Sequence, residues 1–295
     1  MDKEEIDNVR KAGKIAREAV EYARGIVKKG ESLLDIAEKI EKKIVELGGR
    51  AAFPVNLSIN EIAAHSTPSY NDDSKAYGLL KVDIGVHIGG YVGDTAFAVD
   101  LEGDEESKKL ILAAEAALHA GVEKIGMGVK IREIGVAIEK ACNTHGVQSI
   151  RNLSGHSIER YNLHSGLTIP NFDNFQDIEI EEGVYAIEPF TTMGDGAVRD
   201  GRLSGIYHLE GEGGVRDKFA REVLEFINEE YMGLPFCSRW IHKKFGTRGL
   251  LALRQIEQAK ILHHYPQLIE RSGRKVAQAE NSVLLVGKEK WVVTK

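Results

Sequence analysis

The sequence Lys81-Val-Asp-Ile-Gly-Val-His-Ile-Gly-Gly-Tyr-Val-Gly-Asp-Thr-Ala-Phe97 contains two β-branched, apolar runs that are joined by two consecutive glycines. Such a pair between such runs strongly indicates a β-hairpin with a two-residue turn. In that register Gly85 lies opposite Asp94, and Asp83 points to the same face two residues earlier. The pattern therefore predicts that the carboxylates of Asp83 and Asp94 converge on one spot.

Converging carboxylates repel each other unless a proton or a cation lies between them. At neutral pH a divalent metal ion is the favoured solution. Taken alone, the segment also fits a solvated polar face on an edge hairpin. The rest of the chain favours the metal ion.

Composition narrows the class of protein. The chain has 295 residues, of which 42% are hydrophobic and 28% are charged, as is typical of a globular protein with a large core. Its net charge of −6 argues against a nucleic-acid partner or an anionic membrane surface, since both favour basic patches. The opening Met-Asp-Lys-Glu-Glu is not a signal sequence, so we expect a cytoplasmic protein without a membrane partner.

The chain contains an internal repeat with a constant offset of 98 residues. Residues 3–47 and 106–146 each predict two helices separated by a glycine-containing break. The matched pairs include Gly30 and Gly128, Leu33 and Ile131, Ile36 and Ile134, Ile40 and Ile138, and Gly48 and Gly146. The repeat predicts two related α/β halves, over about 3–105 and 106–190, with a site between them.

The second half also supplies a carboxylate to the site between the halves. The pattern of residues 183–190 predicts a strand that carries Glu188 near its end. Residues 191–270 are expected to form a helical insertion, with a glycine-rich start and helices over 217–231 and 248–264. Residues 271–295 are expected to close the fold with strands.

Within the closing segment, the alternation of residues 276–286 places Gln278, Glu280 and Ser282 on one face of a strand. Two features of the insertion are interpreted as solvated helix surface. These are the basic run 239–244 and the pair His263-His264.

The chain contains an ordered set of motifs that together are typical of one protein family. The motifs are Phe53-Pro-Val-Asn-Leu-Ser58, Ala64-His-Ser-Thr-Pro68, Val82-Asp-Ile-Gly-Val-His87, Gly93-Asp-Thr-Ala96, Asn152-Leu-Ser-Gly-His-Ser-Ile158, Leu163-His-Ser-Gly166, Ile187-Glu-Pro-Phe190, Pro235-Phe-Cys-Ser-Arg-Trp240 and Ala277-Gln-Ala-Glu280. Over essentially its whole length the chain resembles type II methionine aminopeptidases of the archaeal branch. The resemblance implies the α/β (α+β) pita-bread fold, in which two pseudo-symmetric halves surround a curved antiparallel sheet. It further implies a single catalytic domain over 1–295 with a helical insertion.

The resemblance also implies a site with two divalent metal ions. Its ligands would be Asp83, Asp94, His156, Glu188 and Glu280. Asp83 would chelate one ion, His156 and Glu188 would bind the other, and Asp94 and Glu280 would bridge. Four carboxylates and one imidazole suit manganese, iron(II) or cobalt, with zinc and nickel as further candidates.

The family's other site residues map onto both halves and the insertion. Glu188 would be the general base, His164 would stabilise the oxyanion, and His65 would contact the scissile amide or the backbone of the first residue. The methionine side chain would lie among Phe53, Leu163, Ile206 and Tyr265, although Ile206 equally fits an ordinary core position. The implied substrates are nascent polypeptide N-termini, which is compatible with ribosome association, and the expected oligomeric state is a monomer.

One departure and two alternatives stay open. Ala279 and Asn281 stand where the family has an aromatic residue and a histidine, which puts the orientation of Glu280 in doubt. An Xaa-Pro peptidase would share the ligands, but the Asn-Leu-Ser motifs and the insertion argue against it. A non-catalytic binding module would have lost ligands that this chain retains.

Overall fold

The structure, a computed structural model, describes residues 1–211 and 213–295. The helices of these residues are α1 (Lys3–Ile26), α2 (Leu33–Glu46), α3 (Glu105–Lys124), α4 (Ile131–Thr144), α5 (Lys218–Tyr231) and α6 (Ser238–Gln258). Both predicted helix pairs are present, and Ser32 caps α2 by accepting a hydrogen bond from the backbone N–H of Asp35. None of the described helices is long and apolar enough to cross a bilayer.

The strands of the described residues form three sheets. In chain order they are β1 (Arg50–Ala51), β2 (Asn56–Ile59), β3 (Ile62–Ala64), β4 (Leu79–Ile88), β5 (Tyr91–Asp100), β6 (Gln148–Ser149), β7 (Ser154–Ile158), β8 (Thr168–Pro170), β9 (Gly183–Ile187), β10 (Phe190–Thr192), β11 (Val198–Leu209), β12 (Phe236–Cys237), β13 (Leu262–Glu270), β14 (Val276–Gln278), β15 (Glu280–Val286) and β16 (Glu289–Val292). The main sheet runs β1-β4-β5-β15-β9-β7-β8, with β2 on β4 and β16 on β15. Smaller sheets follow the orders β14-β10-β6 and β12-β11-β13-β3.

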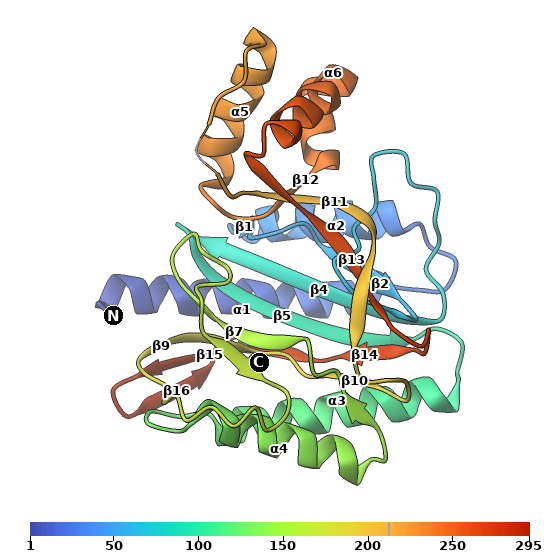
Figure 1. The fold of residues 1–295 in the computed structure, drawn as a ribbon, viewed down its shortest axis with the longest axis vertical. Coiled ribbons are helices and arrows are strands. Elements are labelled where there is room, and N and C mark those ends of the chain that lie inside the picture. Colours follow the sequence, from blue (N-terminus) through green and yellow to red (C-terminus); the bar gives the residue numbers. More distant parts are fainter. Residues whose placement is uncertain (212) are drawn as a thin grey trace.

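The predicted hairpin is formed by β4 and β5 in the predicted register. Ile88 pairs with Tyr91, and Gly85 pairs with Asp94. The turn residues Gly89 and Gly90 both have positive φ, at 56° and 91°, as a two-residue turn of this hand requires. The hairpin occupies the middle of the molecule in Figure 1.

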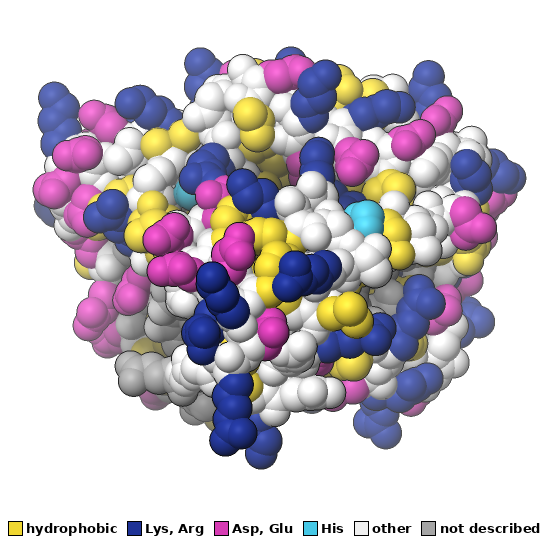
Figure 2. Space-filling model, turned by 90° about the horizontal axis from the view of Figure 1, so that it is seen from above, with side chains coloured by type: hydrophobic (Ala, Val, Ile, Leu, Met, Phe, Trp, Pro, Cys, Tyr) yellow, Lys and Arg dark blue, Asp and Glu magenta, His cyan; other side chains and the backbone are white. Residues whose placement is uncertain are grey.

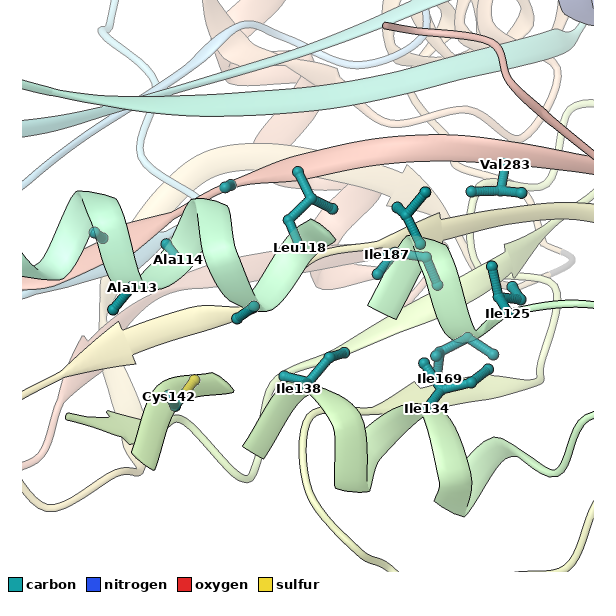
Figure 3. Packing of buried hydrophobic residues seen from close by; sticks show 14 of the residues in the cluster. Ala113, Ala114, Leu118, Ile125, Ile134, Ile138, Cys142, Ile169, Ile187 and Val283 are labelled. Atoms are coloured by element: carbon teal, nitrogen blue, oxygen red, sulfur yellow. The ribbon is translucent and has the colours of Figure 1, made fainter. Parts of the chain in front are cut away.

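Two helix pairs cover different parts of the sheet, as expected for the pita-bread fold. One core cluster joins α1 and α2 to the hairpin strands, and a second joins α3 and α4 to β9 and β15. Figure 3 shows the second cluster, where Leu118 of α3 and Ile138 of α4 approach Ile187 of β9. The glycines that precede α2 and α4, Gly30 and Gly128, both have positive φ. The antiparallel pairing and the curved mixed α/β arrangement confirm the predicted fold class.

Gly13 shows how closely α1 packs, and it yields a testable prediction. A Cβ at this position would lie 2.4 Å from the carbonyl oxygen of Val293, whereas a Cβ at Gly25 of the same helix would meet nothing within 4 Å. We expect Gly13→Ala to lower the free energy of unfolding by about 1–3 kcal/mol through overpacking. Gly25→Ala should raise it by up to about 1 kcal/mol, because alanine favours the helix. Urea titrations of both variants test this, and equal effects would contradict it.

The insertion contains long strands that the sequence did not predict. Residues 198–209 were expected to be irregular, yet they form the long strand β11. Its pairing with β13 shifts register twice, between Asp200 and Leu203 and between Leu203 and Ile206. Such shifts disrupt the alternation of buried and exposed residues that identifies a strand in a sequence. In Figure 1, β11 and β13 run side by side from the helices α5 and α6 towards the main sheet.

The predictions for residues 248–264 and for His263-His264 were also partly wrong. Helix α6 ends at Gln258, and residues 262–270 form β13. His263 and His264 therefore point to opposite faces of a strand instead of lying at a helix end. The predicted strand 276–286 is broken at Ala279 into β14 and β15. Pro266 in β13 pairs at the irregularity opposite Leu203, which explains why a proline is tolerated there.

Arg239 is a further correction, because it belongs to the core and not to a solvated helix surface. Its side chain is 3% exposed and donates to both carboxylate oxygens of Glu41, at 2.7 and 2.8 Å. Glu41 also accepts hydrogen bonds from Trp240 Nε1 and from the backbone N–H of Val55. Arg239 donates in addition to the carbonyl of Pro68. This buried pair ties α6 to α2 and to two loops of the first half.

Candidate active site

The five expected metal ligands lie on neighbouring strands of the main sheet. Asp83 lies on β4, Asp94 on β5, Glu280 on β15 and His156 on β7, and Glu188 directly follows β9. Glu280 pairs with Ala96, two residues from Asp94, and His156 pairs with Ala186, two residues from Glu188. Because side chains two apart point to one face, the register brings all five side chains together.

The closest contacts within this group, here called the carboxylate cluster, surround His156. Its Nε2 lies 3.7 Å from Asp94 Oδ2 and 3.7 Å from Glu188 Oε1. Ligand atoms of Asp94, His156 and Glu280 all lie within 4.8 Å of one another. The spacing leaves room for an ion among them, since metal–ligand bonds to these groups are about 2.0–2.2 Å long.

Burial and mutual repulsion shift the pKa of every carboxylate in the cluster upwards. Burial raises the pKa of Asp83 to about 7. Burial, followed by the charge of Asp83, raises the pKa of Asp94 well above its usual range. For Glu188 and Glu280 the causes are burial and then the charge of Asp94, and the pKa of each is raised well above the ordinary glutamate value. Four carboxylates crowded in this way are stabilised as anions when a cation lies among them.

The remaining contacts fit a metal ion. Asp83 Oδ1 and Asp94 Oδ1 are buried and have no hydrogen-bond partner among the described residues. Burial lowers the pKa of His156 to about 3, which keeps the imidazole neutral and able to bind a metal. Its Nδ1 lies 3.4 Å from the carbonyl oxygen of Ser157, so that Nε2 is left facing the carboxylates.

Glu280 is oriented through its backbone and through Gln278. The carbonyl of Glu280 accepts a hydrogen bond from Thr95 Oγ1 at 2.9 Å, and its Oε2 lies 3.5 Å from Gln278 Nε2. The side chain of Asn281 instead accepts from Thr294 Oγ1. Ser282 Oγ bonds both the N–H and the carbonyl of Asp94. The strands β5 and β15 are therefore still joined by hydrogen bonds, although Ala279 and Asn281 replace the family's usual residues beside Glu280.

A cavity of about 340 Å³ lies beside the carboxylate cluster. It is lined by every site residue that the sequence suggested. Besides the five members of the cluster, these are Phe53, His65, Leu163, His164, Ile206 and Tyr265. Phe53 is positioned by Gly85, where a Cβ would lie 2.2 Å from the Phe53 ring. The cavity therefore combines an apolar wall with an acidic end.

Two histidines flank the polar end of the cavity. His65 has the left-handed φ of 58°, and its Nδ1 lies 3.3 Å from the carbonyl of Pro266. The His164 ring packs edge-on against His156, with centroids 4.4 Å apart. Burial lowers the pKa of both His65 and His164 to about 4, so that both are neutral at physiological pH. Neutral imidazoles can each donate one hydrogen bond and accept another.

Sequence reasoning missed several lining residues, among them Asn56, Pro235 and Leu268. Asn56 lies opposite Asp83 in the register of β2 and β4, and its Oδ1 is buried without a partner among the described residues. The recurring Asn-Leu-Ser motif was the available signal for Asn56. Pro235 and Leu268 come from the insertion, and no local pattern marks them as cavity residues.

Comparison with known proteins identifies the family of this chain. Residues 7–218 match Metallopeptidase family M24. The chain is similar to a methionine aminopeptidase of Thermococcus onnurineus, with 44% identity over 292 residues that cover 96% of this chain and 97% of that protein. It is also similar to a methionine aminopeptidase of Methanocaldococcus jannaschii, with 40% identity over 298 residues and all of both chains.

Solved structures agree on the fold. The crystal structure of a methionine aminopeptidase from Rickettsia prowazekii matches with a TM-score of 0.71, 19% identity and coverage of 100% of this chain and 98% of that one. An identity of 19% supports the fold alone. The two methionine aminopeptidases described above are 44% and 40% identical to this chain over nearly its full length. The chain therefore belongs to metallopeptidase family M24 and, within it, to the methionine aminopeptidases.

Proposed function

We propose that the carboxylate cluster binds two divalent metal ions and that the adjoining cavity receives the N-terminal methionine which this aminopeptidase removes. The observation that carries the proposal is the convergence of four carboxylates, two buried and two half-buried, with one neutral imidazole. The side chains that would hold the ions are those of Asp83, Asp94, His156, Glu188 and Glu280.

Divalent ions in such a site supply Lewis acidity and lower the pKa of bound water towards neutrality. Glu188 is the proposed general base, because it lines the cavity and its carboxylate can take a proton and pass it to the leaving amine. His164, neutral and beside His156, donates a hydrogen bond to the developing oxyanion. His65 lines the same cavity and would contact the scissile amide or the backbone of the first residue.

The same geometry explains why only the first residue is removed. The acidic end would hold the proposed ions, and a free α-amino group would bind there and anchor the substrate by its N-terminus. The methionine side chain then lies against Phe53, Leu163, Ile206 and Tyr265. A cavity of about 340 Å³ limits the length of side chain that fits beside the cluster.

The donor set also bears on the choice of metal. One nitrogen and four carboxylates form a hard, oxygen-rich site that suits manganese, iron(II) or cobalt, with zinc and nickel as further candidates. Mn²⁺ is the most useful probe, because it favours oxygen ligands.

The proposal is tested with metal-stripped protein, a Met-Ala-Ser peptide and an assay for free methionine. We expect no release without metal, release on addition of Mn²⁺ or Co²⁺, and two equivalents of Mn²⁺ bound at equilibrium. An Xaa-Pro peptide should remain intact under the same conditions. Undiminished release after chelation, or cleavage of the Xaa-Pro peptide alone, would overturn the proposal.

The proposed substrates in the cell are nascent polypeptides with a free N-terminal methionine, in the cytoplasm and within reach of the ribosome. We also propose that the chain is a monomer. Its net charge of −6 argues against a nucleic-acid or anionic membrane partner. On the face drawn in Figure 2, acidic and basic side chains are interspersed and not gathered into one basic patch. A sedimentation measurement with and without ribosomes tests both proposals.

A further inference from the structure

The strands β11 and β13 carry a second group of metal-ligand side chains that the proposed mechanism does not use. His208 of β11 lies directly opposite His263 of β13. Glu210 follows two residues later, and its backbone N–H continues the pairing by donating to the carbonyl of Ile261. Residues opposite each other and residues two apart share one face of a sheet. His208, Glu210 and His263 therefore lie on the same face.

The distances of two pairs in this group, His208 with His263 and His263 with Glu210, suit a shared ion. The ring centroids of His208 and His263 are 5.3 Å apart. Two imidazoles that bind one tetrahedral ion through bonds of 2.0–2.1 Å have centroids about 5 Å apart. His263 Nδ1 lies 3.7 Å from Glu210 Oε2. The Glu210 side chain is 63% exposed, so that it can rotate to close the third bond.

The His208 imidazole has a ring nitrogen without a partner among the described residues. This nitrogen, Nδ1, is buried. The neighbouring His264 provides the contrast, because its Nδ1 lies 2.7 Å from Glu257 Oε1 and its Nε2 accepts from the N–H of Gly205. His264 is thus a satisfied structural histidine, whereas leaving a buried ring nitrogen unpaired costs free energy. His263 is 39% exposed, which leaves this face open to solvent.

We propose that His208, His263 and Glu210 form a separate binding site for one zinc-type divalent ion, such as Zn²⁺, Ni²⁺, Co²⁺ or Cu²⁺. Two imidazoles and one carboxylate favour these ions over Mg²⁺ or Ca²⁺, which prefer oxygen ligands. Both histidine rings pack against Tyr265, with centroids 5.3 and 4.7 Å from it, and Tyr265 lines the methionine cavity. The site therefore lies beside the methionine cavity, on the strand face that also carries Ile206 and Tyr265.

Zinc binding to metal-stripped protein, measured by equilibrium dialysis, tests this site. We expect the double variant His208→Gln, His263→Gln to bind one Zn²⁺ fewer per chain than the wild type. The single variant His263→Gln changes the more exposed ring and should weaken this ion at least tenfold. The matched control is His119→Gln, which removes an exposed histidine from α3 and should bind as the wild type does. Equal stoichiometry in the wild type and the double variant would overturn the proposal.

Copper provides a second readout that does not depend on activity. The carboxylate cluster offers a single histidine, whereas this site offers two. Electron paramagnetic resonance of bound Cu²⁺ should therefore show a species with two imidazole nitrogens that is absent from the double variant. A spectrum with one nitrogen at most in the wild type would contradict the site. Because the comparison is between variants, it holds whether or not the carboxylate cluster binds its two proposed ions.

Discussion

Replacing Glu188 by glutamine is expected to lower kcat for release of methionine from Met-Ala-Ser by roughly 10²–10⁴-fold, the usual contribution of a general base. Glutamine has nearly the same shape but cannot take the proton that must reach the leaving amine. KM should change little, since the residues around the methionine side chain are untouched. The assay is free methionine at saturating Mn²⁺, which separates a lost base from weakened metal binding.

The matched control is Glu181→Gln, because Glu181 is an exposed carboxylate just before β9, the strand that delivers Glu188. It should retain wild-type kcat. If Glu188→Gln also retained it, Glu188 could not be the general base, and the proton would have to leave by another group. If the activity returned only at much higher Mn²⁺, the role of Glu188 would be confined to holding metal.

Removing the Glu41 side chain should have the largest effect on stability. Glu41→Ala would leave the 3% exposed guanidinium of Arg239 without its bidentate partner, and Trp240 Nε1 without an acceptor. Breaking a buried ion pair from one side costs about 3–5 kcal/mol, because an uncompensated charge stays buried. We expect a loss of that size in the free energy of unfolding, measured by urea titration.

The same variant should raise KM, because Arg239 also holds the carbonyl of Pro68, close to His65, and Glu41 holds the N–H of Val55, close to Phe53. The control is Glu46→Ala on the same helix, which breaks an exposed pair with Lys42. It should cost less than about 0.5 kcal/mol and leave KM unchanged. Similar losses in both variants would show that the buried pair contributes no more than a surface pair.

The β4–β5 hairpin and the two helix pairs were predictable because their signals are local. Gly89-Gly90 specifies the turn and thereby the register, and the register alone puts Asp83 and Asp94 on one face. Glycines at equivalent places before α2 and α4 reveal the repeated plan. The apolar spacing of the helices then assigns their buried faces. Strand β11 escaped prediction because its pairing with β13 changes register twice.

The sequence by itself determined which residues can carry the chemistry, because hairpin, helix and ligand-type signals depend on neighbours along the chain. Only the tertiary structure decided what surrounds them. The order β5-β15-β9-β7 brings Glu280, Glu188 and His156 to Asp94, although they lie far apart in sequence. Likewise the long strands of the insertion bring Ile206 and Tyr265 to the cavity and set His208 opposite His263. Pairings between distant segments depend on the packing of the whole chain, which no local pattern records.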